Sequence, residues 1–404
     1  MRVLFVAQGP SHVQWQIPLA WASQLAGHEV LVATRPPYVD QVARAGLTAV
    51  AVGDEQRIAA LEKQVKDDFL AAVGRRVHDE GGTDFVPTER EMLIAGGRKM
   101  IALAEGMTED AVALTRAWHP SVIVHDTGAL VGVVAAAVAG VPAFGQIWGA
   151  TSDGIFDVAD DHIHPYFAPL FERYGAQAPT VTPAWIDPSP PSMRAQLPVR
   201  RVDMRYTPYS GPGLVPDWLW QEQTGPRVCL TTGISVSDGT SPWGGEVQRT
   251  VVETLRERGC EVVVTVKNAD HPSLRDLPSG VRVVESFPLN VLLPTCAAVV
   301  HHGGTGTGTT ALALGVPQLV LAHHPMHRQW GAQVADSGAG LMVRIDEETD
   351  TAAIAASARA VVDSPGLRAK AAEVAAEMAA MPAPSEVVGI LEKAAVEHSN
   401  GAPS

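Results

Sequence analysis

The chain has 404 residues, enough for two or three domains, and its formal net charge is −14 at pH 7. This acidic balance argues against nucleic acid as a partner, because proteins that bind phosphate backbones normally present a basic face. Its three cysteines, Cys229, Cys260 and Cys296, lie in or beside apolar runs, which suits a reducing compartment and predicts a cytoplasmic protein. Because no apolar stretch reaches transmembrane length without glycine or proline, we expect no membrane span.

Strand and helix patterns alternate through the first half of the chain. Buried-strand patterns occupy residues 2–7, 29–34, 48–52, 121–124 and 141–147, and helical patterns occupy 13–25, 101–118 and 128–139. Residues 54–100 are more charged and irregular, with isolated apolar side chains such as Phe69. Such alternation predicts an α/β fold with a parallel, doubly wound sheet.

The rhythm breaks at residues 205–226, which are rich in glycine, proline and other turn formers. We therefore place an N-terminal domain at 1–210, a linker at 211–226 and a second α/β domain at 227–382. In that second domain the predicted strands are 227–231, 261–266 and 281–284, with a helix at 246–258. Ligands of such sheets bind at the carboxyl ends of the strands, so we expect a substrate cleft between the two domains.

A glycine-rich block at 301–317 lies between two buried-strand patterns, 297–300 and 318–321. The pattern predicts a strand, a tight turn, a helix and a strand, and it places free backbone N–H groups at a helix N-terminus, where the helix dipole favours an anion. Glycines would let a diphosphate approach the backbone, while hydroxyl and imidazole groups would add hydrogen bonds. The candidate anion-binding residues are His302, Gly304, Thr305, Gly306 and Thr307. The alternative interpretation is a tight turn with a purely structural role.

A second strand-to-turn pattern, 229–235, opens the second domain, and Thr232, Gly233 and Ser235 could offer donors to the same anion. A dinucleotide-binding enzyme is the obvious competitor for such a fold. That alternative requires Gly-x-Gly-x-x-Gly directly after the first strand, whereas this chain continues with residues 8–12, Gln-Gly-Pro-Ser-His. A simple hydride-transfer enzyme is therefore disfavoured.

Several segments together resemble the bacterial family-one glycosyltransferases that attach deoxysugars to antibiotic aglycones. The resemblance covers nearly the whole chain and is weakest at 54–100. Its most specific part is the His-Gly-Gly-x-Gly-Thr block followed by Gly-Val-Pro-Gln. The matching segments are residues 11–12, 18–22, 26–30, 188–193, 301–318 and 338–340. The resemblance implies a GT-B fold, two Rossmann-like domains facing each other across a cleft, with the C-terminal helix, 383–404, packed back on the first domain.

The resemblance also implies an inverting transfer from a nucleoside-diphosphate sugar, with His12 as general base and Asp126 as its partner. A base opposite the leaving group would make an acceptor hydroxyl more nucleophilic, and a histidine titrates near neutral pH. A carboxylate behind the ring would fix its tautomer. His12 should lie in the loop after the first strand, and the alternative is that it only caps the following helix. The helix N-terminus and His302 would stabilise the leaving diphosphate, so neither a metal nor another cofactor is expected.

Two departures from the family pattern concern the donor. Where relatives carry an Asp-Gln pair that binds sugar hydroxyls, this chain has Met326 and His327, although a register shifted to residues 328–329 stays open. Methionine beside a deoxygenated carbon leaves no buried carboxylate unpaired, so the change favours a deoxysugar. Where relatives stack an aromatic ring on the base, either Ser286 replaces it or Phe287 takes its place, and we prefer Phe287. The His-x-x-x-His spacing of His323 and His327 has no carboxylate motif beside it, so we assign it no metal.

The acceptor pocket should come from the N-terminal domain, because aromatic and methionine side chains there suit a flat apolar aglycone. The candidates, each of which could equally belong to the core, are Trp15, Phe85, Met92, Trp148 and Phe156. The sequence thus predicts a metal-independent, inverting glycosyltransferase with a dTDP-sugar donor and an apolar aglycone acceptor, and it leaves a homodimer open. The alternatives are a sugar-nucleotide epimerase of the same fold and a non-catalytic partner of a glycosyltransferase.

Overall fold

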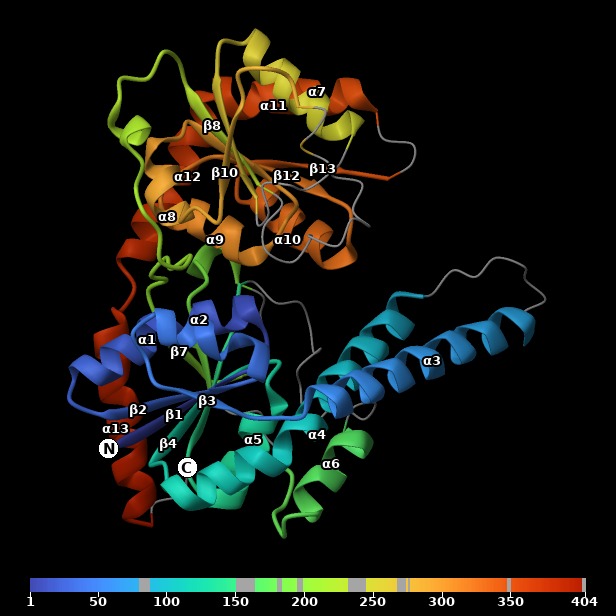
Figure 1. Cartoon of the computed structure of the whole chain (residues 1–404), viewed down its shortest axis with the longest axis vertical. Helices are drawn as coiled ribbons and strands as arrows, with labels where there is room; N and C mark the ends of the chain where they lie inside the picture. Colours follow the sequence, from blue (N-terminus) through green and yellow to red (C-terminus); the bar gives the residue numbers. More distant parts are fainter. Residues whose placement is uncertain are drawn as a thin grey trace.

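The computed structural model shows two α/β domains stacked along the long axis of the molecule (Figure 1). It describes residues 1–79, 88–149, 164–179, 184–194, 199–231, 245–266, 274, 277–346 and 350–401. Every strand pairing in these ranges is parallel, as the alternation of strands and helices predicts.

The N-terminal domain is built on a seven-stranded sheet with the order β3-β2-β1-β4-β5-β6-β7. Its strands are β1 (Arg2–Ala7), β2 (Glu29–Thr34), β3 (Ala49–Ala51), β4 (Val122–Asp126), β5 (Ala143–Gln146), β6 (Ala184–Asp187) and β7 (Arg201–Asp203). Its helices are α1 (Pro10–Leu25), α2 (Val39–Arg44), α3 (Glu55–Asp79), α4 (Glu89–Trp118), α5 (Leu130–Ala139) and α6 (His164–Glu172). The central strands β1 and β4 pair in register from Val3 with Val122 to Val6 with His125, which brings their carboxyl ends together.

The C-terminal domain repeats this plan with a six-stranded sheet of order β10-β9-β8-β11-β12-β13. Its strands are β8 (Arg227–Thr231), β9 (Glu261–Val266), β10 (Arg282–Glu285), β11 (Ala298–His301), β12 (Gln318–Ala322) and β13 (Gly340–Arg344). Its helices are α7 (Glu246–Glu257), α8 (Leu289–Leu292), α9 (Thr305–Ala313), α10 (Pro325–Asp336), α11 (Thr351–Asp363) and α12 (Pro365–Ala379). The glycine-rich block therefore forms the turn between β11 and α9, as predicted.

Strand β1 shows how the sequence pattern builds two cores around the first sheet. Val3 and Phe5 point to one face, toward α1 and α2, whereas Leu4 and Val6 point to the other, toward α4 and α5. All four side chains are fully buried. A continuous apolar run is thus what a central parallel strand covered on both faces requires.

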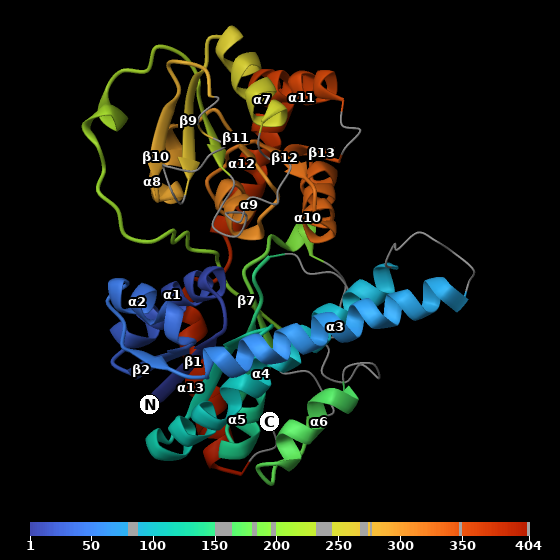
Figure 2. The same ribbon diagram turned by 45° about the vertical axis from the view of Figure 1, so that its right-hand side comes forward.

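Residues 54–100 are the main difference between the sequence interpretation and the structure. The sequence suggested an irregular region, but it holds all of α3 and the first part of α4. These two long helices pack against each other and project from the body of the domain (Figure 2). In α3 the apolar positions Ile58, Leu61, Val65, Phe69 and Val73 recur at spacings of three and four, which is helical. This stripe is thin and set among many charges, so it is easily missed.

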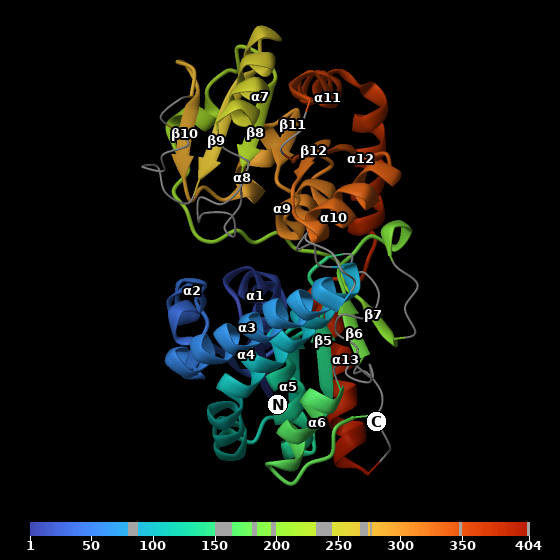
Figure 3. The ribbon, with the colours of Figure 1, turned by 90° about the vertical axis from the view of Figure 1, so that its right-hand side faces the viewer.

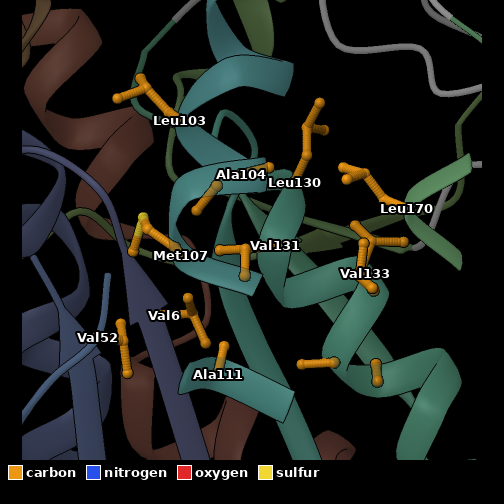
Figure 4. Close-up of a cluster of buried hydrophobic side chains, with 14 of the residues drawn as sticks. Val6, Val52, Leu103, Ala104, Met107, Ala111, Leu130, Val131, Val133 and Leu170 are labelled. Carbon is orange, nitrogen blue, oxygen red and sulfur yellow. The ribbon is translucent and has the colours of Figure 1, made fainter. Parts of the chain in front are cut away.

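A close-up of the first core shows how α4 is held on the sheet (Figure 4). Ala104, Met107 and Ala111 share one face of α4 and are buried against Val131 of α5 and Val6 of β1. Small residues on this face let the helices approach closely, and the apolar area removed from water stabilises the contact.

The final helix, α13 (Pro384–Ser399), returns to the N-terminal domain, where it packs on α1 (Figures 1 and 3). Val387, Val388 and Leu391 join the core around β1, and Glu392 pairs with His28 at 2.9 Å. Residues 365–399 are long and apolar enough to span a membrane by length and composition alone. They form two helices, α12 and α13, separated at residues 380–383, whose apolar faces are buried in different domains.

Candidate active site

His12 lies in the first turn of α1, just beyond the carboxyl end of β1. The prediction that it sits in a loop is therefore wrong: Pro10, which needs no helical N–H partner, starts the helix two residues earlier. The N-cap is Gly9, and no side chain bonds to it or caps this end, so His12 does not act as a helix cap. Its side chain keeps 18% of its surface exposed, which leaves part of the ring accessible to a ligand.

Asp126, the last residue of β4, holds the His12 ring. His12 Nδ1 lies 3.0 Å from Asp126 Oδ1. The carboxylate is buried and also accepts main-chain hydrogen bonds from Gln8, Gly128 and Ala129 at 2.9 to 3.1 Å. These bonds fix the carboxylate and orient the ring, so that Nδ1 donates to Asp126 and Nε2 is left as a proton acceptor.

Trp148, one of the predicted acceptor residues, stacks on His12. The ring centroids are 4.2 Å apart and the planes are inclined by 23°. The indole is half-buried. Trp148 therefore contacts the candidate base directly.

The candidate anion site is formed by the turn between β11 and α9. Gly303 adopts a φ of +99°, a left-handed conformation that favours glycine. Gly304 is the N-cap of α9 and Thr305 its first residue, and no side chain caps this end. The main-chain N–H groups of Gly304, Thr305 and Gly306 therefore lie where a helix leaves donors unpaired. Thr307 is buried, with 9% of its surface exposed.

His301 and His302 precede this turn and differ in role. His301 Nε2 lies 2.8 Å from Gln318 Oε1, and its Nδ1 accepts a hydrogen bond from the Gly303 N–H at 3.2 Å. Burial lowers the pKa of His301 to about 4, so the neutral ring acts as a rigid spacer that fixes the turn. His301 and Gln318 were not predicted as site residues from the sequence. The only sequence signal for His301 was its place beside His302.

His302 is directed at the start of α9. A Cβ at Gly304 would lie 2.7 Å from His302 Nε2, so the imidazole edge borders the N-cap directly. Burial, and then His327 and His301, lower the pKa of His302 well below its usual value, while the neighbouring main chain of Thr231 offsets part of this shift. His302 is therefore a neutral hydrogen-bonding group at pH 7.

The predicted sugar and base contacts follow β12 and β10, two strands that are separated by three others in the sheet. Met326, at the start of α10, is 48% exposed, whereas His327 is partly buried with its ring 4.8 Å from that of His302. Phe287 is half-buried beyond the end of β10 and lies 6.2 Å from the ring of Trp218. Among the described residues, no group of three or more His, Cys, Asp or Glu side chains is arranged so that it could hold a metal ion.

The two domains are in contact beside the start of α9. Trp15, expected in the acceptor pocket, is 6% exposed and contacts Tyr206, with the ring centroids 4.7 Å apart and the planes tilted by 53°. The Tyr206 hydroxyl lies 3.0 Å from Thr310 Oγ1 of α9. Gly149, next to Trp148, lies so close to Thr305 that a Cβ at Gly149 would be 2.8 Å from Thr305 Cβ. The candidate base and the candidate anion site are thus joined through Trp148, Gly149 and Thr305.

Other predicted residues lie elsewhere. Met92 is 39% exposed on α4. A pocket of about 150 Å³ between α3, α4 and α6 is lined by other residues, among them Leu61, Arg98 and Tyr166. The remaining candidates lie outside the described residues; they are Phe85, Phe156, Thr232, Gly233 and Ser235.

Two facing parallel-sheet domains of this kind define the GT-B fold, and solved structures of glycosyltransferases with that fold match nearly the whole chain. A spinosyn rhamnosyltransferase, SpnG, complexed with thymidine diphosphate is 31% identical, with a TM-score of 0.79 over 97% of this chain and 100% of that chain. The glycosyltransferase VinC in complex with dTDP is 28% identical, with a TM-score of 0.79 over 98% of this chain and 100% of that chain.

The sequence comparisons identify the family. Residues 21–233 match the N-terminal domain, and residues 249–394 the C-terminal domain, of the erythromycin biosynthesis protein CIII-like family. The chain belongs to this family and is a glycosyltransferase. It is 36% identical to an aclacinomycin-T 2-deoxy-L-fucose transferase of Streptomyces galilaeus, over 98% of this chain and 97% of the relative. It is 35% identical to a TDP-daunosamine transferase of Streptomyces peucetius, over 98% of each chain.

Proposed function

We propose that this glycosyltransferase transfers a deoxysugar from a dTDP-sugar to a polyketide-type or other natural-product aglycone, with inversion and without a metal ion. The observation that carries the proposal is the His12–Asp126 pair, which lies across the domain contact from the uncapped N-terminus of α9. The names of the relatives, several of which are transferases of deoxysugars, support the choice of donor and acceptor.

The proposed mechanism uses both domains at once. His12 Nε2 accepts the proton of the acceptor hydroxyl while Asp126 stabilises the imidazolium that forms. The hydroxyl oxygen attacks the anomeric carbon from the face opposite the diphosphate, whose C–O bond breaks with its electron pair leaving on dTDP. The N–H groups at the start of α9, with His302, bind the leaving diphosphate, so fixed dipoles replace the positive charge that a metal would supply.

Substituting His12 tests the proposal most directly. His12→Ala should leave the affinity for dTDP nearly intact and lower turnover by on the order of 10²–10⁴, the usual contribution of a positioned base. Asp126→Asn should lower turnover less severely. Calorimetry with dTDP and single-turnover assays measure the two effects separately.

The substrates for this assay come from a screen of dTDP-sugars against aglycones, with products identified by mass spectrometry. Polycyclic and macrolide aglycones are the first acceptors to test. A wild-type protein that forms no glycoside but interconverts dTDP-sugars would support the epimerase instead. Near-normal turnover of His12→Ala on a hydroxyl acceptor would contradict the assignment of the base.

A further inference from the structure

Three imidazoles gather where the starts of α9 and α10 meet. His302 comes from the turn before α9, whereas His324 and His327 come from the N-cap and first turn of α10. The ring of His327 lies 4.8 Å from that of His302 and 5.5 Å from that of His324. This imidazole cluster, His302, His324 and His327, thus spans the two helix N-termini, which lie side by side facing the other domain (Figures 1 and 3).

Two glycines make this approach of α10 to α9 possible. A Cβ at Gly303 would lie 2.7 Å from His327 Cβ, and one at Gly308 would lie 2.2 Å from Nε1 of the buried Trp330. Any side chain at these positions would push α10 away from α9. The close approach of His327 to the turn is therefore built into the packing of the two helices.

The imidazole cluster presents buried polar ring atoms to the start of α9. His302 is 4% exposed, and the Nε2 edge of its ring lies against Gly304, the N-cap of α9. The main chain of Thr231 is a hydrogen-bond partner of the same ring. His324 Nδ1 is occupied, since it accepts the Met326 N–H at 3.3 Å. A ligand at the uncapped start of α9 would therefore meet His302 and His327 together.

The ionisable groups around the cluster are basic, which favours an anion. His301 and His327 lower the pKa of His302, and His323 and Arg328 lower that of His324. The pKa of His327 is lowered by His324, His301 and His323. Within the described part of the chain, none of the groups that shift these three pKa values is a carboxylate. All three pKa values are lowered, chiefly by burial, and that of His327 to about 4.

We propose that His327, supported by His324, forms a second face of the diphosphate site opposite the start of α9, and that the imidazole cluster takes up a proton when the nucleotide sugar binds. This inference rests on the proposed diphosphate role of α9. It assigns His327 to the phosphates, whereas the position in the sequence had suggested a contact to the sugar.

The proton balance follows from the charges. Before the nucleotide sugar binds, the rings of His302, His324 and His327 are neutral at pH 7, because their pKa values lie below that pH. A bound dianion stabilises an imidazolium and raises its pKa by about one to three units, so one proton moves from solvent to a ring nitrogen and no covalent bond changes. The bound state then holds more protons than the free state, and affinity must rise as pH falls.

Calorimetric titration with dTDP-glucose tests this linkage. That ligand is chosen over dTDP because its diphosphate carries a sugar on its end and has no ionisation near neutral pH. Wild-type affinity should increase roughly tenfold from pH 8 to pH 6, as expected for one group whose pKa rises toward 7 on binding. Titrations in two buffers of different ionisation enthalpy should give an uptake of about one proton near pH 6.

A matched pair of variants locates the proton. His327→Gln should keep the affinity at pH 8 within about threefold but lose most of the pH dependence. His323→Gln removes an exposed imidazole bonded to the Ile345 carbonyl, at 3.1 Å, and should keep the pH dependence, because His327 is still present. If His327→Gln folds poorly, the imidazole proton signals of the wild type, followed by NMR with and without dTDP-glucose, give the pKa change directly.

The possible failures are distinguishable. Absence of dTDP-sugar binding at every pH would contradict the proposed function itself. Tight binding that does not change between pH 8 and pH 6, or a pH dependence that persists in His327→Gln, would overturn only the proton-linked site.

Discussion

Asp126 shows how one buried side chain can serve both the fold and the proposed chemistry. Its carboxylate accepts four hydrogen bonds, one from His12 and three from main-chain N–H groups that follow β1 and β4. Only an acceptor-only group satisfies all four donors, since the amide nitrogen of asparagine would face an N–H. The carboxyl ends of the two central strands are thus tied together by the same residue that orients the candidate base.

Met326 is the residue most directly linked to donor choice. If it faces the sugar, Met326→Asp should shift preference from a dTDP-2,6-dideoxysugar toward dTDP-glucose, whose additional hydroxyl can pair with the carboxylate. Because Met326 is 48% exposed, water can solvate that carboxylate, and we expect a shift of only about 1 kcal/mol, roughly fivefold in the ratio. Competition assays between the two donors measure this ratio.

An exposed carboxylate placed far from the donor provides the control for this prediction. Val396→Asp, on the 59% exposed position of α13, should leave the ratio unchanged. A Met326→Asp ratio equal to that of Val396→Asp would mean that Met326 does not contact the sugar.

At the scale of elements, the parts predictable from sequence were those with a strong local pattern. The strands β1, β2, β8 and β9 have the expected limits, because apolar runs bounded by turn formers leave little choice. The glycine-rich block likewise specifies the start of α9 through local chemistry. By contrast, β6 and β7 were missed, since strands of four and three residues are too short to show a clear pattern.

The candidate site was harder to predict where it depends on tertiary packing. The pairing of His12 with Asp126 was expected from the family resemblance, and the register of β1 with β4 brings the two residues together. The stacking of Trp148 on His12, and the contact of Trp15 with Tyr206, depend on loop and domain placement that no local pattern encodes. The capping box of Thr88 and Glu91 at the start of α4 was a local signal that could have revealed this helix.

Helix α4 offers a direct test of the packing between α3 and α4. A Cβ at Gly106 would lie 2.3 Å from Ile58 Cγ1, whereas one at Gly96 would meet nothing within 4 Å. Gly106→Ala should therefore lower the free energy of unfolding by about 1–3 kcal/mol through overpacking. Gly96→Ala, on the same helix, should raise it by about 0.5–1 kcal/mol, because alanine restricts the unfolded chain and favours helix. Urea denaturation measures both values, and equal effects of the two substitutions would contradict the close packing of α3 on α4.

At the scale of the whole molecule, a few contacts hold the domains in register around the site. Besides the contact of Tyr206 with Thr310, Ser192 Oγ donates to Glu377 at 2.7 Å, and the Arg205 N–H donates to the Pro382 carbonyl at 2.6 Å. The last of these lies at the crossing point between α12 and α13. Because α13 then packs on α1, the chain passes between the domains twice, which restricts how they can move apart.

Gly149 is the contact through which domain placement should affect catalysis. Its φ is +107°, and any Cβ there would press on Thr305 at the start of α9 while its neighbour Trp148 holds His12. Gly149→Ala should therefore move the base relative to the diphosphate site. A displacement of about 1 Å is enough to lower kcat/KM on the order of 10²-fold.

Gly27→Ala is the matched control, because Gly27 has a similar φ of +87° but no atom within 4 Å of a Cβ. Both substitutions should lower the free energy of unfolding by about 1 kcal/mol through backbone strain, so stability alone cannot separate them. Only Gly149→Ala should reduce turnover, measured with saturating donor so that weaker binding does not contribute. Equal turnover in the two variants would show that the Gly149–Thr305 contact does not align His12 with the donor. The position of His12 relative to the sugar would then have to depend on other contacts between the domains.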